Sequence, residues 1–202
     1  SAYYLDNVNA IIPMREYPEL DTISSDMAPM PVAACFRLED EYLSVQFEKF
    51  IKEFKATPEY EDMYDRWFKG DVRDAHKELK GTANGPVLKV ATMLGSPPMN
   101  MILNGVSDGF EIEMMRRFAF HIGRPVEFEI MDFGGIIPSL IAGRTDIAVA
   151  IINVTEERQR VIRQIPYYDS KVVALVMKPG MADKSEGLPV WIIVLLSVLI
   201  LS

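Results

Sequence analysis

An amide and a guanidinium follow an apolar run in the second half of the chain. The run "IAVAII", residues 147–152, is typical of a strand buried on both faces. Asn153 follows directly, and Arg158 comes after Thr155, which can cap a helix. A guanidinium can hold a carboxylate through two parallel hydrogen bonds, and an amide and the first N–H groups of a helix can assist it. The pattern predicts a corner that binds an anion, unless Arg158 pairs instead with Glu157 or another surface acid.

Other kinds of reactive site have no pattern in this sequence. The single cysteine, Cys35, lies in the apolar run "PVAACFR" and reads as a buried core residue. The two histidines stand alone, so no zinc site is expected, and there is no glycine-rich phosphate loop or nucleophile elbow. The acids near the predicted corner form no recognisable acid–base pair: Asp132, Asp146, Glu156 and Glu157. We therefore expect no metal, no cofactor and no enzymatic activity.

Composition limits the class of protein. The chain has 202 residues, of which 49% are apolar and 25% charged, enough for one or two folded domains. The net charge of −8 leaves no broad basic face for a phosphate backbone. We therefore expect no nucleic-acid partner, whereas a small ligand would respond only to the local field.

A polar, glycine-containing stretch, residues 69–86, divides the chain. Before it, two amphipathic helices are predicted over residues 39–55 and from Pro58 onward, the first with an apolar face of Leu43, Phe47, Phe50, Ile51 and Phe54. After it, strands and helices alternate. Strands are predicted over residues 87–92, 126–131, 146–152 and 171–178, and helices over 109–123, 135–143 and 154–163.

Alternating strands and helices predict an α/β fold with a mainly parallel sheet flanked by helices. Ligands in such sheets bind at the carboxyl ends of the strands. Both "SPPMNM", residues 96–101, and "INVTEER", residues 152–158, fall at such ends. The predicted anion corner therefore lies where this fold class places its sites.

The last residues are strongly apolar. Residues 188–201 contain no charge, and we interpret residues 188–202 as the possible start of a membrane segment; a buried terminal helix is the alternative. Residues 179–187 before them read as a polar linker.

A family resemblance appears in residues 87–178. The segments "LKVATMLGSPPMNM", "GFEIEMMRRFAFHIG", "IPSLIAG", "TEER" and "PYYDS" resemble, in order and spacing, the N-terminal half of a family 3 extracellular solute-binding protein. These are type II periplasmic binding proteins of amino-acid ABC transporters, and ionotropic glutamate receptors share their fold. Residues 1–68, with "AYYLDN" and "VAACFRLEDEYLSVQFEKFIKEF", resemble the C-terminal half of the same family. The two halves thus stand in reversed order, joined by the linker at residues 69–86.

The resemblance implies roles for matching residues. Arg158 would hold the α-carboxylate of an amino acid, helped by Asn153 and by the backbone of Ile151. Asp6 would meet the α-ammonium group. The alternatives for Asp6 are a helix N-cap or a strand-end acid exposed to solvent.

Three further positions would line the ligand side chain. Phe133 would pack on it. Met99 and Ser96 take places that the family usually fills differently, and a methionine makes a softer, less selective pocket than an aromatic ring.

The resemblance implies binding of an amino acid or similar small polar solute for ABC-type transport. The expected partners are the ligand, the membrane subunits of a transporter and, through residues 188–202, the membrane. The expected location is periplasmic or extracellular, with membrane attachment. The alternative is the ligand-sensing domain of a membrane receptor or glutamate-receptor-like channel. In either case we expect the strands "PVAACFR" and "KVVALVMK" to lie side by side, with residues 31–68 completing the sheet of residues 87–178.

Overall fold

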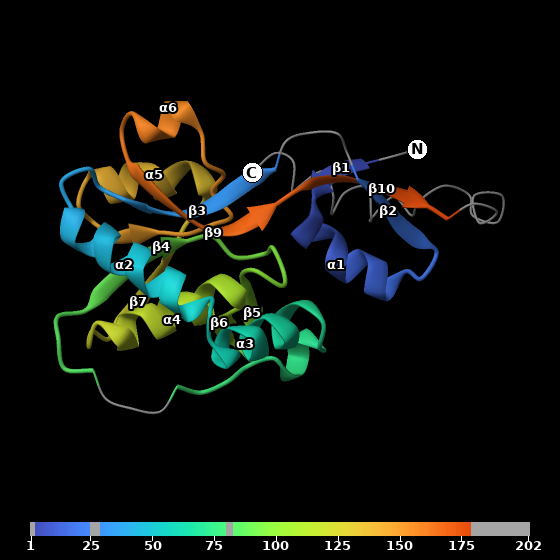
Figure 1. Ribbon diagram of the computed structural model, residues 1–202, viewed down its shortest axis with the longest axis horizontal. Coiled ribbons are helices and arrows are strands. Elements are labelled where there is room, and N and C mark those ends of the chain that lie inside the picture. Colours follow the sequence, from blue (N-terminus) through green and yellow to red (C-terminus); the bar gives the residue numbers. More distant parts are fainter. Residues whose placement is uncertain (1–2, 25–28, 80–82, 179–202) are drawn as a thin grey trace. The chain divides into compact units, whose positions relative to one another are not determined.

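The computed structural model describes residues 3–24, 29–79 and 83–178 (Figure 1). The chain divides into two compact units. One comprises Pro31–Asp169, and the other comprises Ser1–Met30 together with Ser170–Ser202.

A five-stranded sheet forms the centre of the larger unit. Its order is β7 (Val126–Ile130), β4 (Leu88–Thr92), β8 (Ile147–Ala148), β3 (Met30–Phe36) and β9 (Arg163–Ser170). β4 pairs in parallel with β7 and β8, as predicted, whereas β3 pairs antiparallel with β8. The α/β class is therefore confirmed, and the sheet is mixed because β3 enters it from the first part of the chain.

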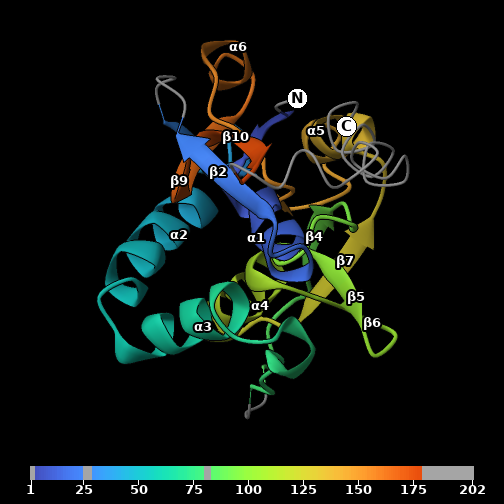
Figure 2. The same cartoon turned by 90° about the vertical axis from the view of Figure 1, so that its right-hand side faces the viewer.

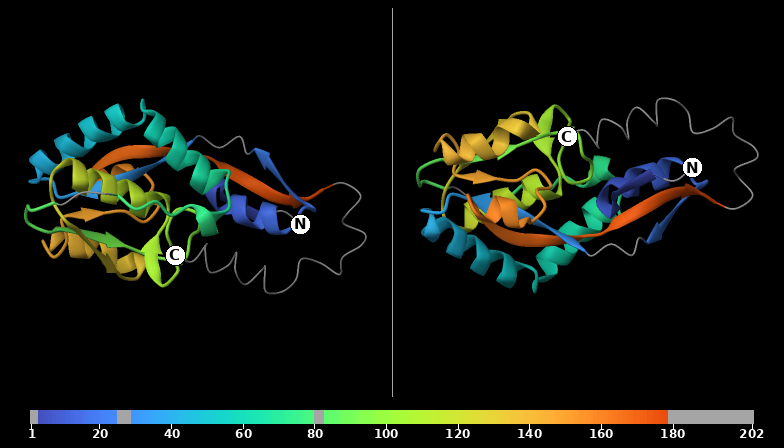
Figure 3. Two further views of the ribbon diagram at one scale, coloured as in Figure 1. Left: turned by 90° about the horizontal axis from the view of Figure 1, so that it is seen from below. Right: turned by 90° about the horizontal axis from the view of Figure 1, so that it is seen from above.

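Helices cover both faces of this sheet. Figures 1 and 3 show α2 (Glu41–Phe54) and α4 (Phe110–His121) on one face and α5 (Phe133–Ile141) on the other. α3 (Pro58–Phe68) begins with proline after Thr57, whose side chain accepts a hydrogen bond from the Tyr60 N–H, and it packs against α4. The predicted apolar face of α2 is entirely buried, with Leu43, Phe47, Phe50, Ile51 and Phe54 all in the core.

Several elements differ from their predicted extent. The strand expected over residues 146–152 is only two residues long as β8, and within the expected range Ile151 leaves the strand conformation with a positive φ of 53°. The helix expected over residues 154–163 is the single turn α6 (Glu156–Gln159). β9 was not predicted, nor was the hairpin of β5 (Met101–Leu103) and β6 (Val106–Asp108) that leads into α4 (Figure 2). A short 3-10 helix, η1 (Val72–Asp74), follows α3.

The smaller unit is built on an antiparallel sheet in the order β1-β10-β2. β1 (Tyr3–Asp6) and β2 (Leu20–Ser24) both pair with β10 (Val172–Met177). α1 (Asn7–Glu16) packs on this sheet, and their shared core contains Ala10, Leu20, Val173 and Leu175.

The expected pairing of residues 31–37 with residues 171–178 is wrong. β3 lies between β8 and β9, whereas β10 pairs with β1 and β2 in the other unit. The physical reason is that β9 runs just before β10 and supplies the neighbour that β3 needs. Residues 31–36 nevertheless join the sheet of β4, β7 and β8, as expected.

The apolar residues 188–202 lie outside the described part of the chain. Within the described residues, none of the helices has the length and apolar character needed to cross a membrane.

Candidate functional site

Arg158 lies in α6 within reach of two other predicted site residues. The Thr155 side chain caps this turn by accepting a hydrogen bond from the Arg158 N–H, at 3.2 Å. The guanidinium is half-buried, lies 5.7 Å from the ring centroid of Phe133, and donates from Nη1 to the carbonyl oxygen of Asn153 at 2.9 Å. The fold therefore brings Arg158, Asn153 and Phe133 together.

The guanidinium of Arg158 forms no ion pair among the described residues, where the ion pairs of other arginines are plain. Glu157, the alternative partner considered above, does not pair with it. A guanidinium carries five N–H donors, and the contact with Asn153 uses only one of its nitrogens. The remaining donors suit a carboxylate from outside the chain.

Asn153 supplies a second polar group at this corner. Its side-chain Oδ1 is buried and has no hydrogen-bond partner among the described residues. Its backbone oxygen accepts from Arg158 and, at 3.1 Å, from Nε2 of Gln164. A buried amide oxygen without a partner costs free energy, so such a group needs an explanation, and a polar ligand is one.

Ile151 holds the loop in a left-handed conformation. Its backbone N–H donates to Oε1 of Glu111 at 2.8 Å, so this donor is used within the protein. Directly after it the loop is fastened to β3, because the Ala33 N–H donates to Ile152 O and the Val154 N–H to Pro31 O. The predicted ligand contact through the Ile151 backbone would therefore fall to its carbonyl group.

Ser96 and Met99 lie in the turn after β4. Both are buried, and the turn closes on itself through the Ser96 N–H, which donates to the backbone oxygen of Asn100 at 2.9 Å. Met99 O accepts from the Glu111 N–H, so the turn also caps α4. Gly109 permits this close approach, since its φ is +132° and a Cβ there would stand 2.3 Å from Met99 O.

Asp6, the predicted partner of the ligand's ammonium group, is the last residue of β1. Its register partner is Val172 of β10. It belongs to the smaller unit, whereas Arg158 belongs to the larger one. The pairing of these two residues around one ligand therefore stays a prediction.

Glu111 is a central residue that the sequence analysis missed. It is completely buried, and its carboxylate accepts hydrogen bonds from Ile151 N–H, from the Tyr167 hydroxyl and, at 2.8 Å, from Nδ2 of Asn100. Burial raises the pKa of Glu111, against the effect of these donors. The available signal was an acid among the apolar residues that open "GFEIEMM".

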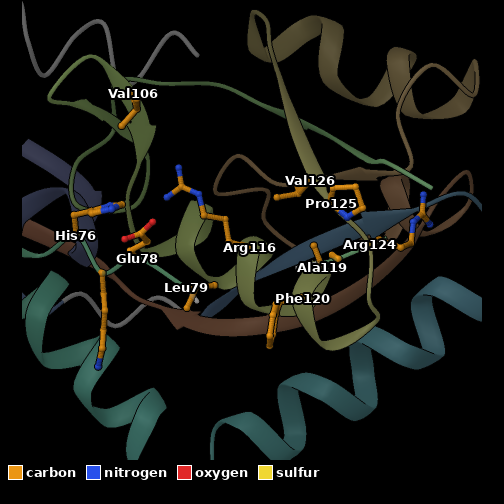
Figure 4. A pocket seen from close by; sticks show the side chains of 12 residues that line it. His76, Glu78, Leu79, Val106, Arg116, Ala119, Phe120, Arg124, Pro125 and Val126 are labelled. Carbon is orange, nitrogen blue, oxygen red and sulfur yellow. The ribbon is translucent and has the colours of Figure 1, made fainter. Parts of the chain in front are cut away.

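A hollow of about 550 Å³ lies beside the C-terminal half of α4 (Figure 4). None of the seven predicted site residues lines it. Its basic groups have acidic partners: His76 Nδ1 and Arg116 Nη1 both contact Asp108, Lys77 contacts Asp62, and Arg124 contacts Asp146. No buried polar atom without a partner faces it among the described residues, so the Arg158 corner is the stronger candidate.

The described residues contain no group of histidine, cysteine or acidic side chains arranged to hold a metal ion. Burial raises the pKa of the Cys35 thiol to about 12, so this cysteine is a core residue and a poor nucleophile.

Known proteins resemble the part of the chain that contains this corner. Residues 88–185 match the model of the bacterial extracellular solute-binding proteins, family 3. The chain is 32% identical over 92 residues to a probable histidine-binding protein of Campylobacter jejuni, covering 45% of this chain and 36% of that protein. It is 26% identical over 98 residues to a probable ABC transporter arginine-binding protein of Chlamydia trachomatis, covering 48% and 38%.

Among solved structures, an ancestral arginine-binding protein bound to arginine is 39% identical, with a TM-score of 0.36, over 37% of this chain and 34% of that one. The chain thus spans little more than a third of the length of these relatives.

The family match covers β4 to β10 and includes α6 with Arg158, Asn153 and Phe133. The larger unit accordingly has the type II periplasmic-binding-protein kind of α/β fold. Proteins of this family are extracellular solute-binding proteins and are not enzymes. Residues 88–185 are thus similar to family 3 of the bacterial extracellular solute-binding proteins.

Proposed function

We propose that this protein binds an amino acid or a similar small polar solute for ABC-type transport, at the Arg158 corner. The observation that carries the proposal is the half-buried guanidinium of Arg158, which has no acidic partner among the described residues. Beside it lies the buried amide oxygen of Asn153, which has no hydrogen-bond partner among them. A carboxylate bound there would accept from the two-pronged guanidinium and from the amide NH₂ group of Asn153. The amide oxygen is itself an acceptor and would need a donor, such as the ligand's ammonium group.

Each site residue has a proposed role. Arg158 and Asn153 hold the α-carboxylate, and Phe133 packs against both the guanidinium and the ligand side chain. Asp6 meets the α-ammonium group, since a carboxylate is the most favourable partner for a cation leaving water. The turn with Ser96 and Met99 borders the site through its link to Glu111 and Ile151.

The proposed ligand class includes cationic amino acids. Two relatives are named for histidine and arginine, and residues of the site fall within the matched region.

The proposed organisation is that of two half-modules in reversed order. Residues 1–68 are the C-terminal half of a binding module, 69–86 a linker, and 87–178 the N-terminal half of a module. Two observations support complementation between them: β3 lies within the sheet of β4 and β8, and Glu113 of α4 binds Arg66 of α3.

Residues 179–187 would link this region to a membrane segment beginning at 188–202, near the membrane subunits of a transporter. The same apolar run supports the second candidate function, the ligand-sensing domain of a membrane receptor or channel. Transport assays in membrane vesicles that carry the protein distinguish the two, since a receptor binds the ligand without moving it.

The test is calorimetric titration of the full chain with arginine, histidine, lysine, glutamine and glutamate. Arg158→Lys keeps the charge but loses the paired donors, so we expect binding to weaken roughly ten- to hundredfold. Arg160→Lys is the matched control, because Arg160 is exposed and only two positions away. Unchanged affinity in Arg158→Lys, or absence of binding to every ligand in the wild type, would refute the proposal.

A further inference from the structure

A single buried carboxylate joins the two loops of the candidate site. Oε1 of Glu111 accepts from the Ile151 N–H at 2.8 Å and also from the Tyr167 hydroxyl, and Oε2 accepts from Asn100 Nδ2 at 2.8 Å. Asn100 closes the turn that holds Ser96, whose N–H donates to Asn100 Oδ1 at 3.2 Å. The turn at 96–100 and the loop at 151–158 are therefore fixed to the same side chain.

The contact to Ile151 falls at the most strained point of this loop. A β-branched residue with φ of +53° is a genuine outlier, and it persists only where the surroundings determine it. Two backbone hydrogen bonds to β3 hold the residues that follow, Ile152 and Val154. Glu111 holds Ile151 itself, through the backbone N–H, and thus acts on the residue from which the chain continues to Asn153 and Arg158.

The chemistry of the three donors suits an ionised glutamate better than any neutral replacement. All three partners donate, so a carboxylate satisfies every one of them. In a glutamine at this position, one of the two terminal atoms is an NH₂ group, which would face another donor. At least one loop would then lose its attachment, although the side chain would keep its size.

Glu113 provides an internal comparison on the same helix. It is equally buried, but its partners are Arg66, Arg117 and the Trp67 indole, all of which lie in α3 or α4. It touches neither site loop among its described contacts. Glu113 therefore holds helices together, whereas Glu111 holds loops.

We propose that Glu111 is a positioning residue for ligand binding: without touching the ligand, it holds the backbone of Ile151 and the turn at 96–100 so that Asn153 and Arg158 present their polar groups together. The inference rests on the proposed function for its effect on affinity, but its effect on the loops can be measured without any ligand.

The test compares Glu111→Gln with Glu113→Gln in the full chain. Native-state amide hydrogen exchange should accelerate about tenfold or more at Ile151–Val154 and at Ser96–Asn100 in Glu111→Gln, because a charge-assisted contact is lost. Titration with L-arginine should show roughly tenfold weaker binding in the same variant. Glu113→Gln should lower the melting temperature while leaving exchange in both loops and affinity unchanged.

Tyr167→Phe is a milder second variant that removes one donor and keeps the carboxylate. It should accelerate exchange at Ile151 by a smaller factor, which keeps the inference testable if Glu111→Gln does not fold. Equal acceleration in the Glu111 and Glu113 variants, or a lower melting temperature in Glu111→Gln with both loops unchanged, would overturn the proposal. If the wild type does not bind L-arginine or the other amino acids, the proposed function fails, and the exchange measurement alone decides the role of Glu111.

Discussion

The two sides of α4 each bury a carboxylate, but the surroundings shift the pKa values of these two groups in opposite directions. Toward α3, Glu113 lies between Arg66 at 2.8 Å and Arg117 at 2.7 Å, with the Trp67 indole donating as well. Burial raises the pKa of Glu113, but these donors outweigh burial and hold it below the usual value. Toward the sheet, Glu111 has only uncharged donors, and burial raises its pKa.

The same contrast extends to the neighbouring groups. The α3–α4 side has paired charges and a cluster of aromatic rings, in which Phe68 of α3 and Phe110 of α4 lie 4.8 Å apart. The loop side has a strained Ile151, an amide oxygen of Asn153 without a partner, and an arginine without an acid among the described residues. One side is arranged for stability. The other departs from the usual rules of packing and pairing, which is the behaviour expected of a binding site.

Removing the anchor of the stable side should have the largest effect. Trp67 is fully buried and donates to Glu113 at 2.8 Å. Trp67→Ala should lower the free energy of unfolding by about 3–5 kcal/mol, because a large aromatic and a hydrogen bond are lost together. Urea denaturation measures this loss. Tyr42→Ala on the exposed side of α2, where the ring is 71% exposed, is the control and should change stability by less than about 0.5 kcal/mol. A small loss in Trp67→Ala would mean that α3 is not part of the folded unit of β4 and β8.

The stability contributions of Glu111 and Glu113 should depend on pH in opposite ways, and their effect should be smaller than that of losing Trp67. Because the pKa of Glu113 is lowered from 4.5 on folding, its contribution is complete above pH 4.5 and is lost as the pH falls below that value. Because the pKa of Glu111 is raised from 4.5 on folding, stability is instead lost as the pH rises from 4.5 through the folded value.

Glu113→Gln should therefore cost about 1.5–3 kcal/mol near neutral pH and flatten the acid limb of the stability curve. Glu111→Gln should flatten the part above pH 4.5. Urea midpoints measured across the pH range check both, and the same limb flattened by both variants would show that the two carboxylates do not differ as described.

Relieving the strain at the loop should have the smallest effect. Asparagine tolerates the left-handed conformation that costs a β-branched residue about 1–2 kcal/mol, so Ile151→Asn should leave stability unchanged or raise it by up to about 1 kcal/mol. Val161→Asn, at a half-exposed position without a positive φ, is the control and should not stabilise. Thermal unfolding measures both variants. A clear destabilisation by Ile151→Asn would mean that packing of the isoleucine side chain, and not strain, governs this position.

Local patterns in the sequence predicted much of the secondary structure. The apolar face of α2 and the start of α3 at a proline could be predicted because helical periodicity and capping act within a few residues. The strand β4 and the helix cap at Thr155 could be predicted for the same reason. β9 was missed because "RQIPYYDS" contains a proline and alternating polarity too weak to indicate a strand.

By itself the sequence determined that the protein is of the α/β class, that residues 87–178 resemble a solute-binding protein, and that Arg158 and Asn153 follow a buried strand. Only the tertiary structure decided that β3 is a neighbour of β8 and β9, that Phe133 lies under Arg158, and that Glu111 joins two loops. The physical reason is the distance along the chain over which each kind of interaction acts. Propensity and periodicity act between residues close in the chain, whereas these contacts join segments whose meeting depends on the packing of the whole sheet.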